Sequence, residues 1–511
     1  MPHNSSETRI QDPFKPWKYL LSPPLKLNFV SPNFMKVLLA ICIFTGFSFI
    51  YFSTFPGQKW RTATCPECEQ PLLHSTYRRH TNIVSATAAG HGVIKTDISH
   101  ILFGIGGSAE TWGQRRRYCE LWWKPNVTRG YVWLDEEPAK PWPETSPPYK
   151  VSEDTTRFKY TNWDGSRSAV RIARIVKESF ELGLDDVRWF VMGDDDTVFF
   201  TENLVNLLNR YDYKQMYYIG GHSESVEQDM AHSYTMGYGG GGFAISYPLA
   251  AELVKILDGC IDRYAEFYGS DHKIESCINE IGVPVTREPG FHQMDIRGSP
   301  YGLLSAHPLA PLISLHHLDY LQPVFPGRNR VGSIKRLIHA YESDPGRVLQ
   351  QSFCYDLTRN WSVSVSWGYN VQLYPFLVRA KDLSTPLQTF LTWGTWSQEP
   401  FTFNTRVLSL KPCERPIIYY FAGVDGSGSG KTLTWYRRPH PEQRRQCKGE
   451  NYGAGYTVKG FNVSAALLDP GIWNKAPRRQ CCEVMSGGDR VDGVVQVRIR
   501  GCNQQESVTP P

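Results

Sequence analysis

Three consecutive aspartates stand between two apolar runs in the stretch WFVMGDDDTVFF, residues 189–200. Adjacent carboxylates repel one another, and flanking strand-forming residues tend to draw them out of water, where charge is costly. Asp194, Asp195 and Asp196 therefore indicate either a solvated turn between strands or a site that holds a cation. Two carboxylates at the end of a buried strand supply hard oxygen ligands for Mn²⁺ or Mg²⁺ and leave positions open for a diphosphate.

The surrounding residues predict alternating strands and helices. Residues 98–112 (ISHILFGIGGSAETW) predict an apolar strand, a glycine turn and the start of a helix, and GYVWLDEEP (130–138) predicts a second strand that ends on acids. Apolar residues at helical spacing follow in 166–182, and RWFVMGDDD (188–196) is the third strand. This alternation is typical of an α/β fold with a mainly parallel sheet, in which ligands bind at the carboxyl ends of the strands.

One segment near the N-terminus has the length and composition of a membrane span. Residues 37–55 are 19 consecutive residues without a charge, which as a helix would cover roughly 28 Å, close to the hydrocarbon thickness of a bilayer. Basic residues predominate before the span, so the positive-inside rule predicts a cytosolic tail at 1–36 and a lumenal remainder, a type II topology. Residues 56–95 are mixed and polar and predict a stem between the membrane and the body.

The cysteines and glycosylation sequons agree with a lumenal body. Cys65 and Cys68 have the spacing of a zinc knuckle, but no second pair has metal-ligand spacing, which argues against zinc. Four late cysteines are clustered as disulfides of an oxidising compartment would be, namely Cys447, Cys481, Cys482 and Cys502. Three predicted lumenal asparagines lie in acceptor sequons, namely Asn126, Asn360 and Asn462.

The C-terminal third differs in character from the α/β portion. From residue 350 to 505, short aromatic and β-branched runs alternate with turns, which predicts a smaller β-rich module, and we set its limits at 331–511. VDGSGSGKT (424–432) has some features of a phosphate-binding loop, but Asp425 stands where the first glycine is required, so we interpret it as a hairpin tip. The net charge of +5 is small for 511 residues and gives no reason to expect nucleic acid as a partner.

A set of short motifs in a fixed order resembles the Fringe-like glycosyltransferases of family 31. The resemblance is greatest to a plant-type group catalogued as a domain of unknown function, and it extends from about residue 100 to 325. The motifs, in order, are ETW (110–112), WFVMGDDDTVFF (189–200), YIGGHSE (218–224), GYGGGGFAIS (237–246), GSDHKIESCINEIGVPV (269–285), GFHQMD (290–295) and SLHHLDYLQPVFP (314–326).

The resemblance implies a GT-A fold over residues 96–330, with a mixed and mainly parallel sheet. It implies a Golgi type II membrane enzyme that transfers a sugar from a UDP-sugar to a hydroxyl of a glycan or glycoprotein acceptor. The transfer would invert the anomeric centre, depend on Mn²⁺ with Mg²⁺ as the alternative, and form a β-1,3 linkage. Assembly as a homo- or hetero-oligomer is left open.

The resemblance also assigns roles to the acidic residues and one histidine. Asp196 would bind Mn²⁺ directly, and Asp194 and Asp195 would assist through the ribose or metal-bound water. His316 of SLHHLD is the best match for the histidine that completes the metal site in relatives. The two alternatives are His317 and His292, and a histidine in so apolar a setting is often only a hydrogen-bonded core residue.

Asp271 aligns with the base that takes the proton from the acceptor hydroxyl. Relatives carry a pair of acids there, whereas GSDH offers Ser270 and Asp271, so one acid is missing. The competing interpretation makes Asp271 the N-cap of a helix over 272–281.

Four further residues are candidates for contact with the nucleotide sugar, each with a structural alternative. Gly240 and Gly241 belong to GGGG, where the backbone can approach a sugar closely or simply make a tight turn. Asp135 and Arg167 would contact uridine or phosphate, or be a solvated acid and a surface arginine.

Two other functions compete with the transferase. The missing acid at Ser270 fits a catalytically silent glycan-binding or scaffold protein of the same fold. A metal-dependent hydrolase of nucleotide sugars would need only water as the acceptor. A substitution of Asp271 distinguishes the enzyme from the scaffold. The enzyme would lose turnover but still bind the nucleotide, whereas the scaffold would lose nothing.

Overall fold

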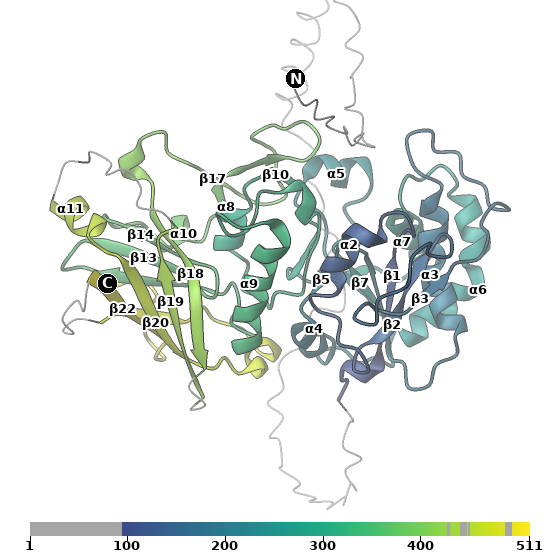
Figure 1. Cartoon of the computed structure of the whole chain (residues 1–511), viewed down its shortest axis with the longest axis horizontal. Helices are drawn as coiled ribbons and strands as arrows, with labels where there is room; N and C mark the ends of the chain where they lie inside the picture. The colour runs from purple at the N-terminus through teal and green to yellow at the C-terminus, as the bar shows by residue number, and fades with distance from the viewer. Residues whose placement is uncertain (1–94, 427–429, 440–446, 448–449, 486–492, 511) are drawn as a thin grey trace, which may run out of the picture. The chain divides into compact units, whose positions relative to one another are not determined.

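The structure is a computed structural model that describes residues 95–426, 430–439, 447, 450–485 and 493–510 (Figure 1). The predicted tail, span and most of the stem, up to residue 94, lie outside the described residues. Within the described part of the chain, no helix is both long enough and apolar enough to cross a membrane.

A seven-stranded mixed sheet forms the centre of the α/β portion, in the order β3-β2-β1-β4-β7-β6-β8. Its strands are β1 (Ile101–Gly106), β2 (Arg129–Leu134), β3 (Tyr149–Val151), β4 (Trp189–Asp194), β6 (Tyr218–Gly220), β7 (Phe243–Ser246) and β8 (Val285–Arg287). The neighbours pair in parallel except that β7 runs antiparallel to β4 and β6. The sheet confirms the predicted α/β class with a mixed, mainly parallel sheet.

The two central strands, β1 and β4, are buried along almost their whole length. Strands covered on both faces read as continuous apolar runs, which is why ILFGIG and WFVMG predict them so clearly. The register pairs Gly106 at the end of β1 with Asp194 at the end of β4. The two strands therefore deliver their following residues to the same edge of the sheet.

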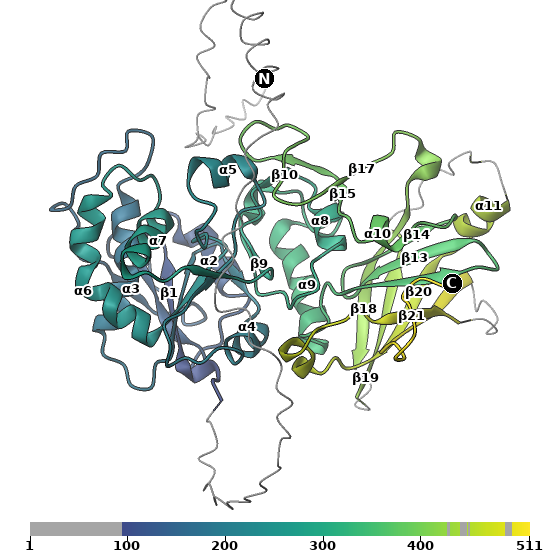
Figure 2. The same ribbon diagram turned by 180° about the vertical axis from the view of Figure 1, so that it is seen from behind.

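Helices α3 (Ser168–Glu181), α6 (Tyr247–Arg263) and α7 (Ser270–Ile281) pack on one another and cover one face of this sheet (Figures 1 and 2). Val170, Ala173 and Val176 lie on one side of α3 at helical spacing and are buried in the same core as Leu253 of α6 and Ile274 of α7. The other helices are α2 (Trp112–Cys119), α4 (Thr201–Leu208), α5 (Val226–Ala231), α8 (Tyr301–Ser305), α9 (Arg330–Ser343), α10 (Ala380–Leu383) and α11 (Glu450–Tyr456).

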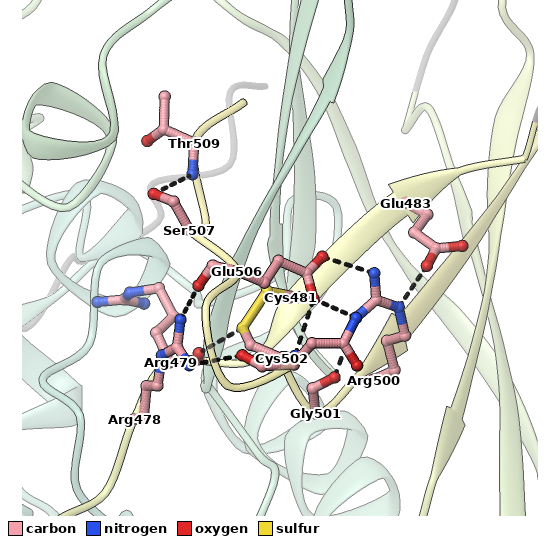
Figure 3. The surroundings of a disulfide bond; sticks show 11 residues. Arg478, Arg479, Cys481, Glu483, Arg500, Gly501, Cys502, Glu506, Ser507 and Thr509 are labelled. Atoms are coloured by element: carbon pink, nitrogen blue, oxygen red, sulfur yellow. Dashed lines mark hydrogen bonds and ion pairs between the residues drawn. A yellow bond between two sulfur atoms is a disulfide. The ribbon is translucent and has the colours of Figure 1, made fainter. Parts of the chain in front are cut away.

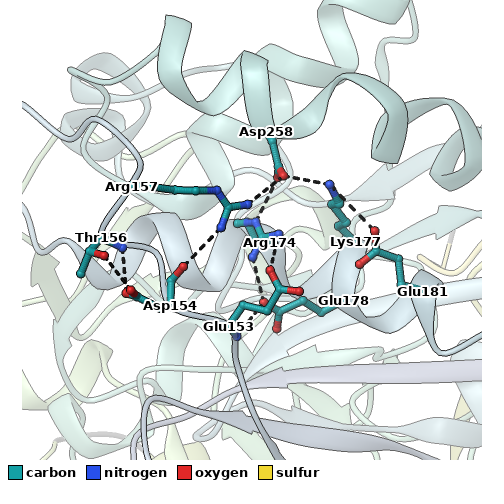
Figure 4. A network of polar contacts seen from close by, with 9 residues as sticks. All are labelled: Glu153, Asp154, Thr156, Arg157, Arg174, Lys177, Glu178, Glu181 and Asp258. Atoms are coloured by element: carbon teal, nitrogen blue, oxygen red, sulfur yellow. Dashed lines mark hydrogen bonds and ion pairs between the residues drawn. The ribbon is translucent and has the colours of Figure 1, made fainter.

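A network of ion pairs connects α3 to α6 (Figure 4). The Arg174 side chain is 1% exposed, and its three guanidinium nitrogens contact carboxylates of Glu153, Glu178 and Asp258 at 3.0–3.1 Å. Lys177 reaches Asp258 at 2.8 Å. A buried arginine is tolerated here because each of its nitrogens has an anionic partner.

Short strands continue the chain beside the main sheet. A three-stranded sheet in the order β5-β11-β9 is made of β5 (Val198–Phe199), β9 (Phe291–His292) and β11 (Ser314–Leu315). Two pairs of strands, β10 (Ile296–Gly298) with β16 (Phe390–Thr392) and β15 (Leu387–Gln388) with β17 (Arg406–Val407), complete this region. Because β5 follows the aspartate turn directly, its pairing with β11 brings the 314–317 segment next to that turn.

The C-terminal strands close into a barrel in the order β12-β13-β14-β18-β19-β20-β22-β21. Burial alternates along β19 and β22, so that Thr432, Thr434 and Tyr436 face inward, as a barrel requires. The hairpin of β18 and β19 confirms the hairpin interpretation of 424–432, although its tip at 427–429 lies outside the described residues. The strands are β12 (Gln351–Asp356), β13 (Trp361–Ser366), β14 (Asn370–Tyr374), β18 (Ile417–Gly426), β19 (Lys431–Arg437), β20 (Gly460–Ala466), β21 (Cys481–Val484) and β22 (Val494–Arg500).

Four disulfides cross-link the described residues, namely Cys260–Cys277, Cys354–Cys482, Cys413–Cys447 and Cys481–Cys502. The first joins α6 to α7. The last lies beside Arg500, which pairs with Glu483 and Glu506 (Figure 3). Disulfides persist in oxidising compartments, so this pattern agrees with the lumenal body that the sequence predicts.

Candidate functional site

The aspartate turn lies at the carboxyl end of β4 and is held by three hydrogen bonds. The Asp194 N–H donates to Thr197 Oγ1 at 2.9 Å, and the Thr197 hydroxyl donates to the Gly240 carbonyl at 2.7 Å. The Asp195 N–H donates to the Gly106 carbonyl at 3.0 Å. The turn is therefore fixed to both β1 and the GGGG segment, and its side chains have little freedom to move away from one another.

The three carboxylates differ in their surroundings. Asp196 is fully buried, and its Oδ1 lies 3.1 Å from His316 Nε2. Asp194 is about one-third exposed, with Oδ2 at 3.7 Å from the same nitrogen. Asp195 is also buried, but it points to Arg115, whose Nη1 lies 2.9 Å from its Oδ1 and 3.5 Å from Asp196 Oδ1.

Asp194, Asp196 and His316 each offer one ligand atom, and these atoms lie within 4.8 Å of one another. Asp196 Oδ1 faces His316 Nε2 and Arg115 Nη1, but Asp196 Oδ2 and His316 Nδ1 have no hydrogen-bond partner among the residues that the structure describes. Buried polar atoms are rarely left without partners, so this site has capacity to bind something further. Two carboxylates and one imidazole form a donor set that suits Mn²⁺.

The titration of these groups reflects the same crowding of negative charge. Burial raises the pKa of Asp194 to about 6, although the nearby His316 opposes the shift. Burial, followed by the Asp196 carboxylate, raises the pKa of Asp195. Burial acts against ionisation of His316, but the adjacent Asp196 raises the pKa of the imidazole to about 9. Without a metal, a protonated His316 therefore supplies part of the positive charge that the aspartates require.

Gly240 is the residue that allows His316 to approach. A Cβ at position 240 would lie 2.1 Å from His316 Cε1, closer than real contacts permit. At Gly241 the nearest atom would be the backbone nitrogen of Gln293, at 3.2 Å. The close approach that the glycines allow is thus to His316 and to the backbone of Gln293.

The two alternative histidines have other partners. His317 has a positive φ of 51° and contacts Asp295 at 2.8 Å through its Nδ1. His292 lies 3.1 Å from Glu224 and 3.0 Å from His307. Of the three candidates, the structure brings only His316 to the aspartates.

Asp271 faces the same cavity as Asp194. Gly239, Ser270 and residues of α3 also line this cavity. The carboxylate accepts hydrogen bonds from the N–H groups of Gly239 at 3.0 Å and His272 at 2.9 Å. The alternative interpretation as a helix N-cap is wrong, because α7 begins at Ser270 and its N-cap is Gly269.

Asp135 lies at the same edge of the sheet, after β2. It accepts hydrogen bonds from Ser108 and from the Ala109 N–H, both at 2.9 Å. Burial opposes ionisation of Asp135, but these two donors outweigh it and lower its pKa. The charged carboxylate is therefore retained at the edge where nucleotides bind in α/β sheets.

The guanidinium of Arg167 binds backbone carbonyls of the preceding loop. Its Nη2 donates to the carbonyls of Thr155, Thr156 and Phe158 at 2.7–2.8 Å. These bonds hold the loop before α3 through one guanidinium nitrogen, and contact between Arg167 and a nucleotide stays a prediction. Arg171, one turn later, donates instead to the carbonyls of Trp133 and Gly107 at the functional edge.

Arg115 is the site residue that the sequence does not single out. It follows Thr111 and Trp112 on α2 in a run of three arginines, and only the fold reveals which one reaches the aspartates. The signal that would have found it is the position of α2 immediately after β1, since such helices begin at the functional edge.

Comparison with known families agrees with this geometry. The family model described as "Fringe-like" matches residues 150–300, which contain the aspartate turn, the GGGG segment and Asp271. The model described as "Protein of unknown function, DUF604" matches residues 228–482.

Over residues 150–300 the chain is similar to Fringe-like proteins. Two curated relatives are both called "Beta-1,3-glucosyltransferase". The one from Mus musculus is 30% identical over 138 residues, which is 27% of this chain and 27% of the relative. The one from Homo sapiens is 30% identical over 109 residues, or 21% of each chain. The chain thus spans about a quarter of the length of these relatives.

Two solved structures share local likeness with the chain. A glycosyltransferase involved in the glycosylation of the major capsid of PBCV-1 has 11% identity and a TM-score of 0.22, covering 37% of this chain and 82% of that one. The catalytic domain of Drosophila beta1,4galactosyltransferase 7, in complex with xylobiose, has 16% identity and a TM-score of 0.21, covering 37% and 64%. TM-scores this low establish no common fold.

Proposed function

We propose that the protein is an inverting, Mn²⁺-dependent glycosyltransferase of the GT-A type that moves a sugar from a UDP-sugar to a glycan hydroxyl. The observation that carries the proposal is the grouping of Asp194, Asp196 and His316 at the carboxyl edge of the sheet, with Asp271 on the same cavity. A Fringe-like family match over this region supports it. The shared name of the curated relatives favours glucose as the donor sugar and a β-1,3 linkage.

The metal would be held by Asp194 Oδ, Asp196 Oδ and His316 Nε2. When bound there, Mn²⁺ supplies positive charge that stabilises the departing diphosphate. Arg115 neutralises Asp195, so that its charge does not add to the repulsion around the phosphate groups. Asp135, at the end of β2, is placed to accept a hydrogen bond from a ribose hydroxyl.

Asp271 would act as the general base. The acceptor oxygen attacks the anomeric carbon on the face opposite the diphosphate, the bond between that carbon and the diphosphate oxygen breaks, and the acceptor proton passes to the carboxylate. One such displacement inverts the anomeric centre. The N–H groups of Gly239 and His272 hold the carboxylate in one orientation, and its remaining lone pairs are available for the proton.

The proposal also includes a location, the lumen of the Golgi. The predicted span at 37–55 would anchor the chain as a type II membrane protein. Support comes from the four disulfides of the described residues. Two sequon asparagines, Asn126 and Asn360, are exposed and so are accessible to glycosylation.

The test is a transfer assay with the purified protein, UDP-glucose, Mn²⁺ and a panel of neutral glycosides as acceptors. Asp271→Asn should lower kcat by about 100-fold or more, because general base catalysis contributes this much, while the KM for UDP-glucose stays the same. Asp212→Asn, an exposed turn residue, is the matched control. UDP release that is equal with and without acceptors would replace the transferase by a hydrolase. Failure to bind any UDP-sugar would favour a silent scaffold.

A further inference from the structure

Strand β16, which follows the end of the Fringe-like match at residue 300, lies next to β10 in the region of the candidate site. Strand β16 pairs antiparallel with β10, so that Phe390 lies opposite Gly298 and Thr392 opposite Ile296. Residues 393–397 follow β16 directly, and we call them the β16 loop. This loop lies within the region that matches DUF604, beyond the end of the Fringe-like match.

Stacked rings connect the β16 loop to the metal site. The ring centroids of His316 and His317 are 3.9 Å apart, and His317 stacks on Trp393 with centroids at 4.4 Å and planes at 5°. Trp393 is buried. The indole of Trp393 therefore lies two ring contacts from the histidine that we assign to Mn²⁺.

Arg297 extends this stack to a second tryptophan. Its guanidinium lies 3.8 Å from the ring centroid of Trp393 and 5.2 Å from that of Trp396. Its Nε also donates to the Trp393 carbonyl at 3.2 Å. Tyr320 packs edge-on against Trp393 at 5.1 Å. Trp396, in contrast, is 60% exposed and has a positive φ of 56°.

The β16 loop is held rigidly although its tip is exposed. Glu227 of α5 accepts hydrogen bonds from the Gly394 N–H at 2.6 Å and from the Thr395 N–H at 3.2 Å. Thr392 accepts from the Ser397 N–H at 2.8 Å. Any Cβ at Gly394 would lie 2.9 Å from the Glu227 carboxylate. Trp396 has a left-handed backbone conformation, which costs free energy at a bulky residue. The hydrogen bonds of the β16 loop hold Trp396 in this conformation with its side chain in solvent.

We propose that Trp396 is a stacking platform for a pyranose ring of the acceptor glycan, beside the Fringe-like site. One face of a pyranose carries several C–H groups, which bind the electron-rich face of an indole, while its hydroxyls stay in water. Trp396 is exposed on a fixed loop and is connected through Arg297, Trp393 and His317 to the proposed metal ligand His316, so it offers such a face beside the proposed site. This subsite rests on the proposed transferase function.

The kinetic test compares Trp396→Ala with Trp396→Phe and with Leu357→Ala, a control at 58% exposure on the barrel. Trp396→Ala should raise the acceptor KM about 10-fold or more, with the KM for UDP-glucose unchanged. Trp396→Phe should recover part of the loss, and Leu357→Ala should behave as the parent. An unchanged acceptor KM in Trp396→Ala would overturn the proposal.

A binding test separates the subsite from the proposed transfer. An array of β-linked oligosaccharides is probed with the full chain carrying Asp196→Asn, and with the same chain also carrying Trp396→Ala. Binding that requires Trp396 supports the subsite even if no donor is ever turned over. Equal binding by both proteins, no binding by either, or a Trp396-dependent self-association in sedimentation would each overturn it.

Discussion

Two clusters of acidic side chains, one around Arg174 and one at the end of β4, are balanced in different ways. Around Arg174, the acids Glu153, Glu178 and Asp258 face Arg174, Lys177 and Arg157 (Figure 4). At the end of β4, the three consecutive aspartates face Arg115 and His316.

The difference lies in which charges are buried. In the Arg174 cluster the buried Arg174 and Glu178 are paired with each other, and the remaining acids, Glu153, Asp258 and Glu181, are partly exposed to solvent. The aspartate cluster keeps a net negative charge of one even when His316 is protonated, and two when it is not. Buried charges that lack partners are costly, so we expect the first cluster to stabilise the fold and the second to be balanced by the cation that we propose.

The largest effect that we expect is on the stability of the fold, when the Arg174 cluster is disrupted. Arg174→Met should lower the free energy of unfolding by about 3 to 5 kcal/mol, because it leaves a buried carboxylate without its partner. Chemical denaturation monitored by circular dichroism measures the change. Activity per folded molecule should stay the same, since Arg174 contacts no residue of the site.

Arg263→Met is the control for this variant. Arg263 and Glu280 form an ion pair that is half exposed on the arginine side, and such surface pairs contribute little to stability. If both variants lost equal stability, the burial of Arg174 would not be the cause.

A second effect concerns the approach of His316. Gly240→Ala places a Cβ against the imidazole and should weaken Mn²⁺ binding by about 10- to 100-fold, the range seen when the support of a metal ligand is disturbed. Isothermal titration calorimetry measures the affinity. Gly113→Ala, in α2 where a Cβ meets nothing within 4 Å, is the matched control and should bind as the parent does. Equal affinity for Gly240→Ala would contradict the assignment of His316.

The smallest effect that we expect concerns how the stability of the fold depends on pH when a metal chelator is present. The two clusters should contribute to this dependence with opposite signs. Burial raises the pKa of Asp194 to about 6, so the folded state binds more protons than the unfolded state and stability falls as pH rises from about 4 to 6. Asp194→Asn should remove about 1 kcal/mol of this loss, a value discounted for its partial exposure. Urea denaturation at pH 4.5 and pH 7 measures it.

Asp258 provides the contrasting sign. Burial opposes its ionisation, but Lys177 and Arg174 outweigh this and lower its pKa. Its contribution is therefore present above about pH 4 and is lost as pH falls further. Asp258→Asn should destabilise the protein at pH 7, where Asp194→Asn stabilises it. If both variants changed the free energy of unfolding at pH 7 in the same direction, the contrast between the two clusters would be wrong.

Much of the site follows from sequence because its residues adjoin strongly patterned elements. The strands that end at Leu134 and Asp194 are mostly apolar, and the helix that contains Asp271 is amphipathic. Such patterns predict elements and their ends well. His316 was identified by resemblance, and the pairing of β5 with β11 explains how it reaches the aspartates.

The residues that sequence missed depend on tertiary contacts. Nothing local distinguishes Arg115 from its two neighbours, or tells that Arg167 binds backbone carbonyls. Strand β16 has three residues, and its partner β10 lies nearly a hundred positions earlier. So short and distant a pairing leaves no periodic signal, and the return of Trp393 to the site could not be predicted.

The most direct measurement is a titration of the purified full-length protein with Mn²⁺ in the presence of UDP, followed by electron paramagnetic resonance, because free Mn²⁺ gives a sharp signal that binding removes. One Mn²⁺ should bind per chain, and Asp196→Asn should abolish that binding while Asp212→Asn retains it. A parent protein that leaves the free signal unchanged, or an Asp196→Asn variant that binds as tightly as the parent, would contradict the cation site on which the account depends.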